Sequence, residues 1–263
     1  MLAHPKHLPE YLIEAGSLAL FMVSAAGFAT LLQHPTSPIA AAFARAGVSP
    51  VVQRIPMGLA MGLTAIAIVY SPFGARSGAH INPAVTLAFL RLGKIASRDA
   101  TGYIAAQFAG GIIGIVTAVG IFGGLPADPA VNYVATQPGN AGPVAAFVAE
   151  LIISFCLMSL VLHVSNTPRI ARLTGLCAGA LVATYIVIEA PLSGMSMNPA
   201  RTFGANVLAH TTRTLWIYFT APPLGMLLAA ELYVRTASRP VRCAKLNHPT
   251  SGRCIFGCEE ITA

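Results

Sequence analysis

Two short stretches share the pattern Ser-Gly-x-x-x-Asn-Pro-Ala, and they constrain the fold more than any other feature of the chain. They cover residues 77–84 and 193–200, and their asparagines, Asn82 and Asn198, lie 116 positions apart (198 minus 82). Asparagine is a preferred N-cap, and proline is favoured at the first helical position because its missing N–H would have no partner there. The repeat therefore predicts two helix starts at equivalent places in two related halves.

Both predicted helices are short. Apolar residues follow each Asn-Pro-Ala box, but Gly93 ends the first run and the polar residues 210–213 end the second. About ten residues remain for each helix, whereas a helix that crosses a bilayer needs roughly 20. We therefore expect two half-helices that enter a membrane without crossing it.

The rest of the chain is typical of a helical membrane protein. Of its 263 residues, 55% are hydrophobic and 10% are charged, whereas soluble domains carry about 25% charged residues. This composition excludes a soluble enzyme. The first apolar segment is longer than the core of a cleavable signal peptide, so we expect it to remain as a membrane helix. Six long apolar spans are predicted, at roughly 10–33, 52–72, 97–122, 142–164, 168–190 and 214–236.

The order of spans and boxes predicts an inverted repeat. Each half, at about 8–123 and 142–236, contains three long spans and one box. Because three is odd, the second half enters from the opposite face, with a pseudo-two-fold axis in the membrane plane. The boxes then enter from opposite sides, and non-helical backbone at that depth is tolerated only where it is buried in protein or lines a wet cavity. We predict an all-α channel domain over 1–236 with a water-filled passage, followed by a tail over 237–263.

Basic residues indicate the orientation. The net charge is +7, but the lysines and arginines flank apolar segments without interleaved aromatic residues, which argues against nucleic-acid binding. Twelve of the 16 fall on one side of the predicted membrane and four on the other. Because basic loops stay in the cytoplasm, we expect both termini there, in a plasma membrane or a bacterial inner membrane. The basic run 235–245 suits anionic lipid headgroups.

Several residues together resemble the aquaporin (major intrinsic protein) family. They are the two Asn-Pro-Ala boxes, Ser-Gly-Ala-His before the first box, an acid in the first span of each half and a glutamine in the third span. The run Asn-Pro-Ala-Arg-Thr-Phe-Gly, which begins at Asn198, adds to the match, and the match covers about residues 8–236. The resemblance implies a passive channel for water and small uncharged solutes, with no enzymatic activity and no cofactor. It also implies a homotetramer with one pore in each protomer.

The paired asparagines suggest how such a pore holds water. A capping asparagine uses its side-chain oxygen on its own helix, which leaves its amide N–H₂ free to point into the lumen. Two such donors, backed by two positive helix ends, would hold a passing water and repel cations and hydronium. The alternative is a pair of ordinary N-caps. The remaining residues of the boxes fix φ at the helix start or allow the loops to approach closely: Pro83, Pro199, Ala84 and Ala200.

Arg201 is a costly charge at this depth unless it serves the pore. The alternative is an arginine that extends to the membrane surface and marks topology. By resemblance, Arg201 belongs to the selectivity constriction together with Ile186, Met195 and a residue of the second span. That residue is Met61 or, alternatively, Gly62.

The predicted constriction departs from that of strict water channels, which by the same resemblance place a histidine at the position of Ile186. Thr202 stands where many glycerol channels carry an aspartate. Met61, Ile186 and Met195 would form an apolar wall that faces one arginine, which suits solutes with an apolar face. We therefore expect permeation of water and of small neutral solutes such as glycerol, urea and ammonia.

Four polar residues are expected to support the loops. Glu14 and Glu150 occupy equivalent places, and we expect them to accept N–H bonds from the loops; the alternative is ion coupling, which would make the protein a secondary transporter. His80 either braces its loop or lines the cytoplasmic vestibule, and Gln107 is expected to hydrogen-bond the first loop. A membrane scaffold with a non-conducting pore is a third alternative, which the intact boxes oppose.

The tail holds Cys243, His248, Cys254 and Cys258 in the order C-x₄-H-x₅-C-x₃-C. Thiolate and imidazole are ligands that zinc prefers, and a reducing cytoplasm disfavours disulfides between these cysteines. The spacings match no familiar zinc finger. We therefore expect a disordered or simply packed tail without a bound metal.

Overall fold

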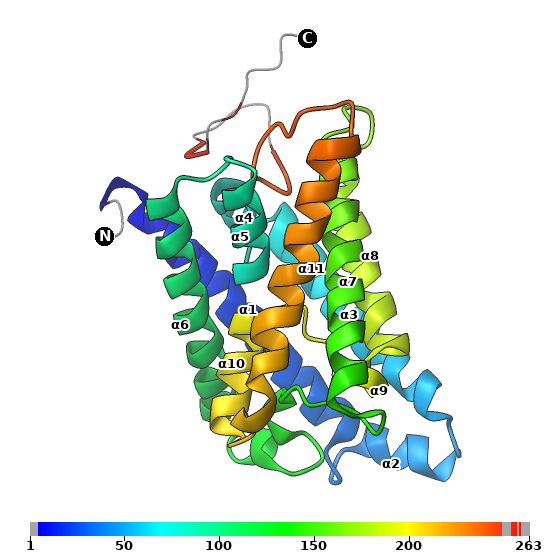
Figure 1. The fold of residues 1–263 in the computed structure, drawn as a ribbon. Coiled ribbons are helices and arrows are strands. Elements are labelled where there is room, and N and C mark those ends of the chain that lie inside the picture. The colour runs from blue at the N-terminus through cyan, green and yellow to red at the C-terminus, as the bar shows by residue number, and fades with distance from the viewer. Residues whose placement is uncertain (1–4, 249–253, 257, 259–263) are drawn as a thin grey trace.

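The computed structural model describes residues 5–248, 254–256 and 258, and in this part of the chain every regular element is a helix. Within these residues, six segments are long and apolar enough to cross a membrane. They form one bundle (Figure 1). The long helices are α1 (Leu8–Gln33), α3 (Pro50–Tyr70), α6 (Ser97–Phe122), α7 (Gly142–Ser165), α8 (Thr174–Ile188) and α11 (Leu215–Thr236).

Two half-helices enter the bundle from opposite ends. α5 (Pro83–Arg91) has 9 residues and α10 (Pro199–Leu208) has 10 residues, so neither crosses it. In Figure 1, α5 lies in the upper half of the bundle and α10 in the lower half. The predicted fold class, an all-α membrane protein with six spans and two re-entrant half-helices, is confirmed.

Short helical elements connect the long ones. They include three α-helices and five 3₁₀ turns within the described residues. These are α2 (Pro38–Arg45), α4 (Pro72–Ser77) and α9 (Ala190–Ser193), with η1 (Pro5–His7), η2 (Leu125–Ala127), η3 (Asn132–Val134), η4 (Ala171–Leu173) and η5 (Thr212–Thr214).

The two halves pack in the same way. α1 lies against α6 in the first half, and α7 lies against α11 in the second. A Cβ at Gly110 would lie 2.3 Å from the carbonyl oxygen of Ala15, and a Cβ at Gly225 would lie 2.3 Å from that of Leu151. Only glycine permits so close an approach of two helix backbones. The same contact therefore occurs once in each half, as an inverted repeat requires.

The fifth span is shorter than the predicted range 168–190. α8 begins at Thr174 and ends at Ile188. The hydroxyl of Tyr70 donates to the carbonyl of Arg172 at 2.6 Å and accepts from the N–H of Leu176 at 3.2 Å. These bonds hold the connection between α7 and α8 as a separate turn, so the first residues of the predicted span do not join the helix.

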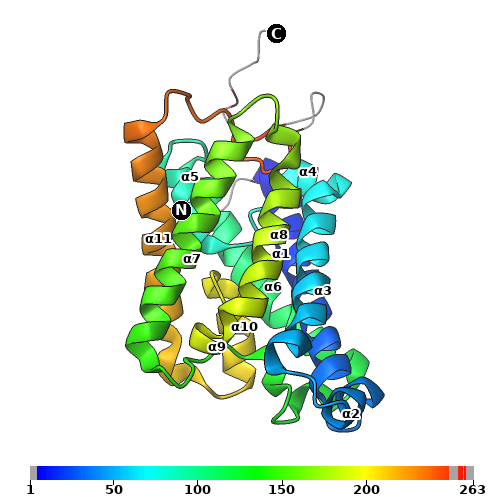
Figure 2. The same ribbon diagram turned by 90° about the vertical axis from the view of Figure 1, so that its right-hand side faces the viewer.

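Both ends of the described chain lie at the same end of the bundle. α1 begins and α11 ends there, whereas α2 and α9 lie at the opposite end (Figures 1 and 2). We call these the terminal end and the far end. The outer faces carry large apolar side chains that are more than half exposed, such as Leu12, Leu63 and Ile121. Such a continuous apolar exterior suits lipid, and the protein is an integral membrane protein.

The tail returns across the terminal end after α11. Val241, Ala244, Leu246 and Phe256 are buried there. The described part of the tail is therefore packed, which is one of the two forms expected from the sequence.

Candidate pore site

A cavity of about 410 Å³ lies between the helices and is lined by both Asn-Pro-Ala loops. Its wall includes Gln33 and Arg54 toward the far end and Val69 and Leu246 toward the terminal end. The predicted site residues on this wall are Met61, His80, Asn82, Ile186, Met195, Asn198 and Arg201. The other predicted site residues are absent from it: Gly62, Glu14, Glu150, Gln107, Pro83, Ala84, Pro199 and Ala200.

Each asparagine caps its own half-helix. The side-chain oxygen of Asn82 accepts from the N–H of Ala84 at 2.9 Å, and that of Asn198 accepts from Ala200 at 3.1 Å and Arg201 at 3.2 Å. Pro83 and Pro199 occupy the first helical position, where no N–H is needed. The Asn-Pro sequence thus fixes both helix starts and points their positive ends at the middle of the cavity wall.

The asparagine amides are not entirely free, which corrects the expectation from the sequence. The Nδ2 of Asn82 donates to the carbonyl of Met197 at 2.7 Å, and the Nδ2 of Asn198 donates to the carbonyl of Ile81 at 2.8 Å. Each carbonyl directly precedes the opposite asparagine, and a carbonyl at membrane depth requires a donor. These reciprocal bonds join the two loops. An amide nitrogen carries two hydrogens, so one on each asparagine remains for a solute.

Both loops reach this junction through the same strained backbone. In the first loop, Ala79 and Ile81 have φ of 55° and 41°; in the second, Met195 and Met197 have φ of 51° and 53°. Non-glycine residues rarely adopt such left-handed conformations, which cost of order 1–3 kcal/mol each. The loops therefore need strong external support.

Glu14 supplies that support in the first half. Its carboxylate accepts from the hydroxyl of Ser77 at 2.8 Å and from the backbone N–H groups of His80 at 3.1 Å and Ile81 at 2.5 Å. The amide of Gln107 donates to the same carboxylate at 2.8 Å and also contacts Thr86 of α5. Gln107 therefore acts on the loop through Glu14 and on the half-helix through Thr86.

Glu150 has the matching role in the second half. Its carboxylate accepts from the hydroxyl of Ser193 at 2.7 Å and from the N–H groups of Ser196 at 2.6 Å and Met197 at 2.7 Å. Both acids are fully buried behind the cavity wall. Buried carboxylates that accept several backbone N–H bonds fix a loop in one conformation.

A tyrosine completes each loop. The hydroxyl of Tyr103 donates to the carbonyl of Ser77 at 2.7 Å, and that of Tyr218 donates to the carbonyl of Ser193 at 2.6 Å. Ser77 and Ser193 are the first residues of the repeated pattern, but the tyrosines that bind their carbonyls lie outside it. Neither tyrosine hydroxyl nor serine carbonyl was predicted as part of the site.

Arg201 lies in the cavity wall beside the second box. Its guanidinium donates to the hydroxyl of Thr136, which belongs to the connection between α6 and α7. Asn206 of α10 fixes this connection, because it accepts from the N–H of Thr136 at 2.9 Å and donates to its carbonyl at 2.8 Å. The repeat could not point to Thr136 or Asn206, because neither has a counterpart in the first half.

The structure distinguishes between the two candidates on the second span. Met61 lies on the cavity wall with Ile186 and Met195. Gly62 instead faces α8, where a Cβ would lie 2.7 Å from the carbonyl oxygen of Gly179. Of these two candidates, Met61 is therefore the one that lines the cavity.

His80 both lines the cavity and braces its loop. Its ring nitrogens lie 3.1 Å from the hydroxyl of Thr86 and 2.8 Å from the carbonyl of Ala244 in the tail. Its ring stacks between Phe89 of α5 and Phe256 of the tail, with ring centroids 5.1 and 5.5 Å away. The tail thus forms part of the cavity wall at the terminal end, where Leu246 also lines it.

A family model and several known proteins match this chain. The model described as "Major intrinsic protein" matches residues 2–233. Aquaporin NIP1-3 of Oryza sativa subsp. japonica is 38% identical over 184 residues, which cover 69% of this chain and 62% of that protein. Aquaporin NIP1-2 of Arabidopsis thaliana is 36% identical over 193 residues, which cover 71% of this chain and 65% of that protein. The matched part of the chain thus spans less than two thirds of the length of these relatives.

A solved structure shares the fold. The X-ray structure of the aquaglyceroporin from Plasmodium falciparum aligns with a TM-score of 0.68 and 21% sequence identity, and the alignment covers 88% of this chain and 97% of that one. At this identity the likeness concerns the arrangement of the helices.

Proposed function

Because the chain belongs to the major intrinsic protein family, we propose that it is a passive transmembrane channel that conducts water and small uncharged solutes and excludes ions and protons. One observation supports this most strongly. Two half-helices point their N-termini at one cavity from opposite ends, and their capping asparagines bond to each other's loops on its wall. Such an arrangement offers fixed donors and a positive field to whatever occupies the cavity.

The wall is suited to neutral solutes. Met61, Ile186 and Met195 supply apolar surface, and Arg201 and the asparagine amides supply hydrogen-bond donors. A neutral molecule that gives up part of its hydration finds donors here, whereas a cation meets the charge of Arg201 and two positive helix ends. Glycerol, urea and ammonia are therefore proposed solutes beside water.

Ion coupling is the principal alternative. A coupled transporter needs an acid that exchanges protons or ions with the passage. Glu14 and Glu150 are absent from the cavity wall, and both bind loop N–H groups. These contacts support a structural role for the acids and favour a channel. The alternative of a non-conducting scaffold is opposed by the cavity that extends past both boxes.

The remaining assignments rest on the family and the sequence. We propose one pore in each protomer of a homotetramer, in a plasma membrane or a bacterial inner membrane, with both termini in the cytoplasm and the basic tail near anionic lipid headgroups. We also propose that the chain catalyses no reaction. Cross-linking of the detergent-solubilised protein tests the tetramer, and accessibility of a tag on the tail in intact cells tests the orientation.

Stopped-flow measurements on proteoliposomes test the channel itself. Permeability to water, glycerol, urea and ammonia is measured in parallel without an ion gradient, with protein-free liposomes as the control. A channel raises the permeability to water and to at least one of the solutes above that of the control. Transport that occurs only under an imposed ion gradient would establish the transporter instead, and no transport at all would support the scaffold.

A further inference from the structure

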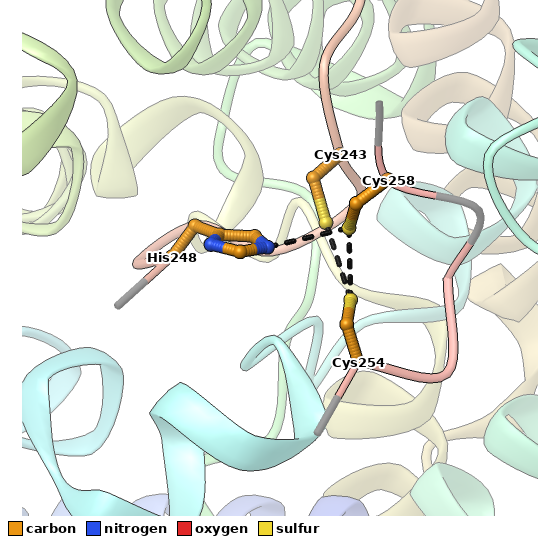
Figure 3. A group of neighbouring side chains, drawn as sticks. All are labelled: Cys243, His248, Cys254 and Cys258. Atoms are coloured by element: carbon orange, nitrogen blue, oxygen red, sulfur yellow. Dashed lines mark hydrogen bonds between the residues drawn. The ribbon is translucent and has the colours of Figure 1, made fainter. Parts of the chain in front are cut away.

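Four potential metal ligands meet in the tail, at the terminal end of the bundle. They are Cys243, His248, Cys254 and Cys258, and one ligand atom from each lies within 4.8 Å of the others (Figure 3). Their spacing along the chain resembles no known zinc finger. The fold brings them together although 15 positions separate the first from the last (258 minus 243).

The distances between the ligand atoms suit a tetrahedral ion. Cys243 Sγ lies 3.6 Å from Cys254 Sγ, and His248 Nε2 lies 3.3 Å from Cys258 Sγ. Zinc–sulfur bonds of about 2.3 Å in a tetrahedron place two sulfurs about 3.8 Å apart. The Sγ atoms of Cys254 and Cys258 lie 2.9 Å apart and need to separate by somewhat less than 1 Å to bind one ion. All three cysteines are free thiols.

Three cysteines and one histidine form one of the usual ligand sets of structural zinc. The donors are soft or borderline, so they disfavour magnesium and calcium, which prefer oxygen. A site with four protein ligands leaves no open position for a reacting molecule. The chemistry of the set therefore indicates a structural ion and not a catalytic one.

The tail also carries a positive charge beside the four ligands. Lys245 is buried in the same segment. Its charge also offsets the net negative charge that three thiolates and one divalent ion would leave.

The ligands flank the tail residues that contact the pore loop. Cys243 directly precedes Ala244, whose carbonyl binds the ring of His80. Cys254 and Cys258 stand on either side of Phe256, whose ring stacks on the same histidine. Two residues beyond Ala244, the N–H of Leu246 donates to the carbonyl of Gly78 at 3.1 Å. An ion that holds the ligands together therefore also holds the segment that lies on the first loop.

A metal ion would also stabilise the fold of this segment. In its described part the tail buries few large apolar side chains, among them Val241, Leu246 and Phe256, and a segment with so small an apolar core gains stability from a bound metal. We propose that Cys243, His248, Cys254 and Cys258 form a zinc-binding site that fastens the tail to the first Asn-Pro-Ala loop. Only its position at a pore mouth rests on the proposed function; the metal binding does not.

Metal analysis of the full chain tests the site. The protein is purified in detergent from zinc-supplemented cells without chelator, and zinc is measured by inductively coupled plasma mass spectrometry. We expect about one zinc per chain, as a single four-ligand site requires, and almost none in the double variant C254S/C258S. The matched control is C156S/C177S, which removes two cysteines outside the cluster and is expected to keep the zinc. Cobalt added to chelator-stripped wild-type protein should give the intense visible bands of a tetrahedral thiolate site.

Hydrogen exchange tests the fastening. Chelation of wild-type protein should speed exchange of the amides in 241–246, and zinc should restore their protection, while the amides of α1 remain unchanged. Wild-type protein that carries no zinc and gives no cobalt bands would overturn the site, as would a Cys254–Cys258 disulfide in freshly isolated protein. Zinc binding without any effect on exchange at 241–246 would overturn the fastening. Zinc bound by a protein that conducts nothing would leave the site intact and refute only the channel.

Discussion

Three positions after its capping asparagine, the first half of the molecule carries Val85, and the second half carries Arg201 at the same place. Both residues line the cavity. Behind them the two halves are alike: a glutamate accepts from a serine and two loop N–H groups, and a tyrosine binds the carbonyl of that serine. The repeat thus preserves the groups that hold the loops, whereas Val85 and Arg201 differ on the cavity wall.

The supports differ in two respects. Glu14 receives an additional bond from Gln107, and the first loop is also covered by the tail through His80. The second loop has Ser196 where the first has His80, and the Ser196 hydroxyl stays within the loop and α10, next to Thr202. Glu14 therefore has a bonded side-chain partner that Glu150 lacks, and substitutions of the two glutamates should have unequal effects.

Arg201→Val makes the second half like the first and should have the largest effect. Removal of the charged side chain beside the second box lowers the barrier to cations, so cation permeability of proteoliposomes should rise by more than tenfold, or about 1.4 kcal/mol of barrier. Water permeability should change far less. Val85→Ala is the control and should admit no cations. A cation-tight R201V variant would show that Arg201 does not set the charge barrier.

The two glutamates test the unequal support. Glu150→Gln places an N–H₂ group against loop donors, and a buried unsatisfied group costs about 1–3 kcal/mol. Glu14→Gln should cost less, because the buried Oε1 of Gln107 has no partner within the described residues and can accept from the new amide. Thermal unfolding in detergent measures both variants. Equal losses for the two variants, or a larger loss for E14Q, would contradict the proposed difference.

Ile186→His tests the apolar side of the wall. An added imidazole narrows the passage and offers water a polar partner, so the ratio of water to glycerol permeability should rise about tenfold, the lower end of the 10–200-fold that a methylene-sized change in a pocket can produce. Ile186→Leu keeps the volume and polarity and should leave the ratio unchanged. An unaltered ratio in I186H would mean that this residue does not meet the solute.

Substitution of the two tyrosines should have the smallest effect, and the loss of stability should be the same in both halves. Tyr103→Phe and Tyr218→Phe each remove one hydrogen bond to a serine carbonyl, and each should lower stability by about 1 kcal/mol. Unfolding of the two variants under identical conditions is the measurement. Because both bonds occupy equivalent places, a strongly unequal pair of losses would show that the two loops are not held alike.

The repeated part of the molecule could be predicted from the sequence because local chemistry fixes it. Asn-Pro sets a helix start wherever it occurs with an apolar run behind it, so the caps at Asn82 and Asn198 and the lengths of α5 and α10 followed from the boxes. The six spans followed from hydropathy, except that tertiary bonds from Tyr70 shortened the fifth.

Contacts between distant segments could not be predicted in this way. The amide of Asn82 bonds across to Met197, 115 positions away, and Thr136 joins Arg201 from a connection that has no repeat. The four potential ligands in the tail have an irregular spacing, and the turns of the chain that bring them together could not be predicted from it. In each case the partner is set by the packing of the whole bundle and not by neighbours in the chain.

Chemical block at Val85 tests the central claim most directly. Val85 lies on the cavity wall beside the first box, so a thiol in a Val85→Cys variant should face the aqueous passage between the half-helices. Water permeability of V85C proteoliposomes is measured by stopped flow before and after a small methanethiosulfonate reagent, with wild-type protein treated in parallel. We predict that the reagent lowers V85C permeability to the level of protein-free liposomes and leaves wild type unchanged. Full water flux through V85C that is demonstrably modified would contradict a passage between the two half-helices.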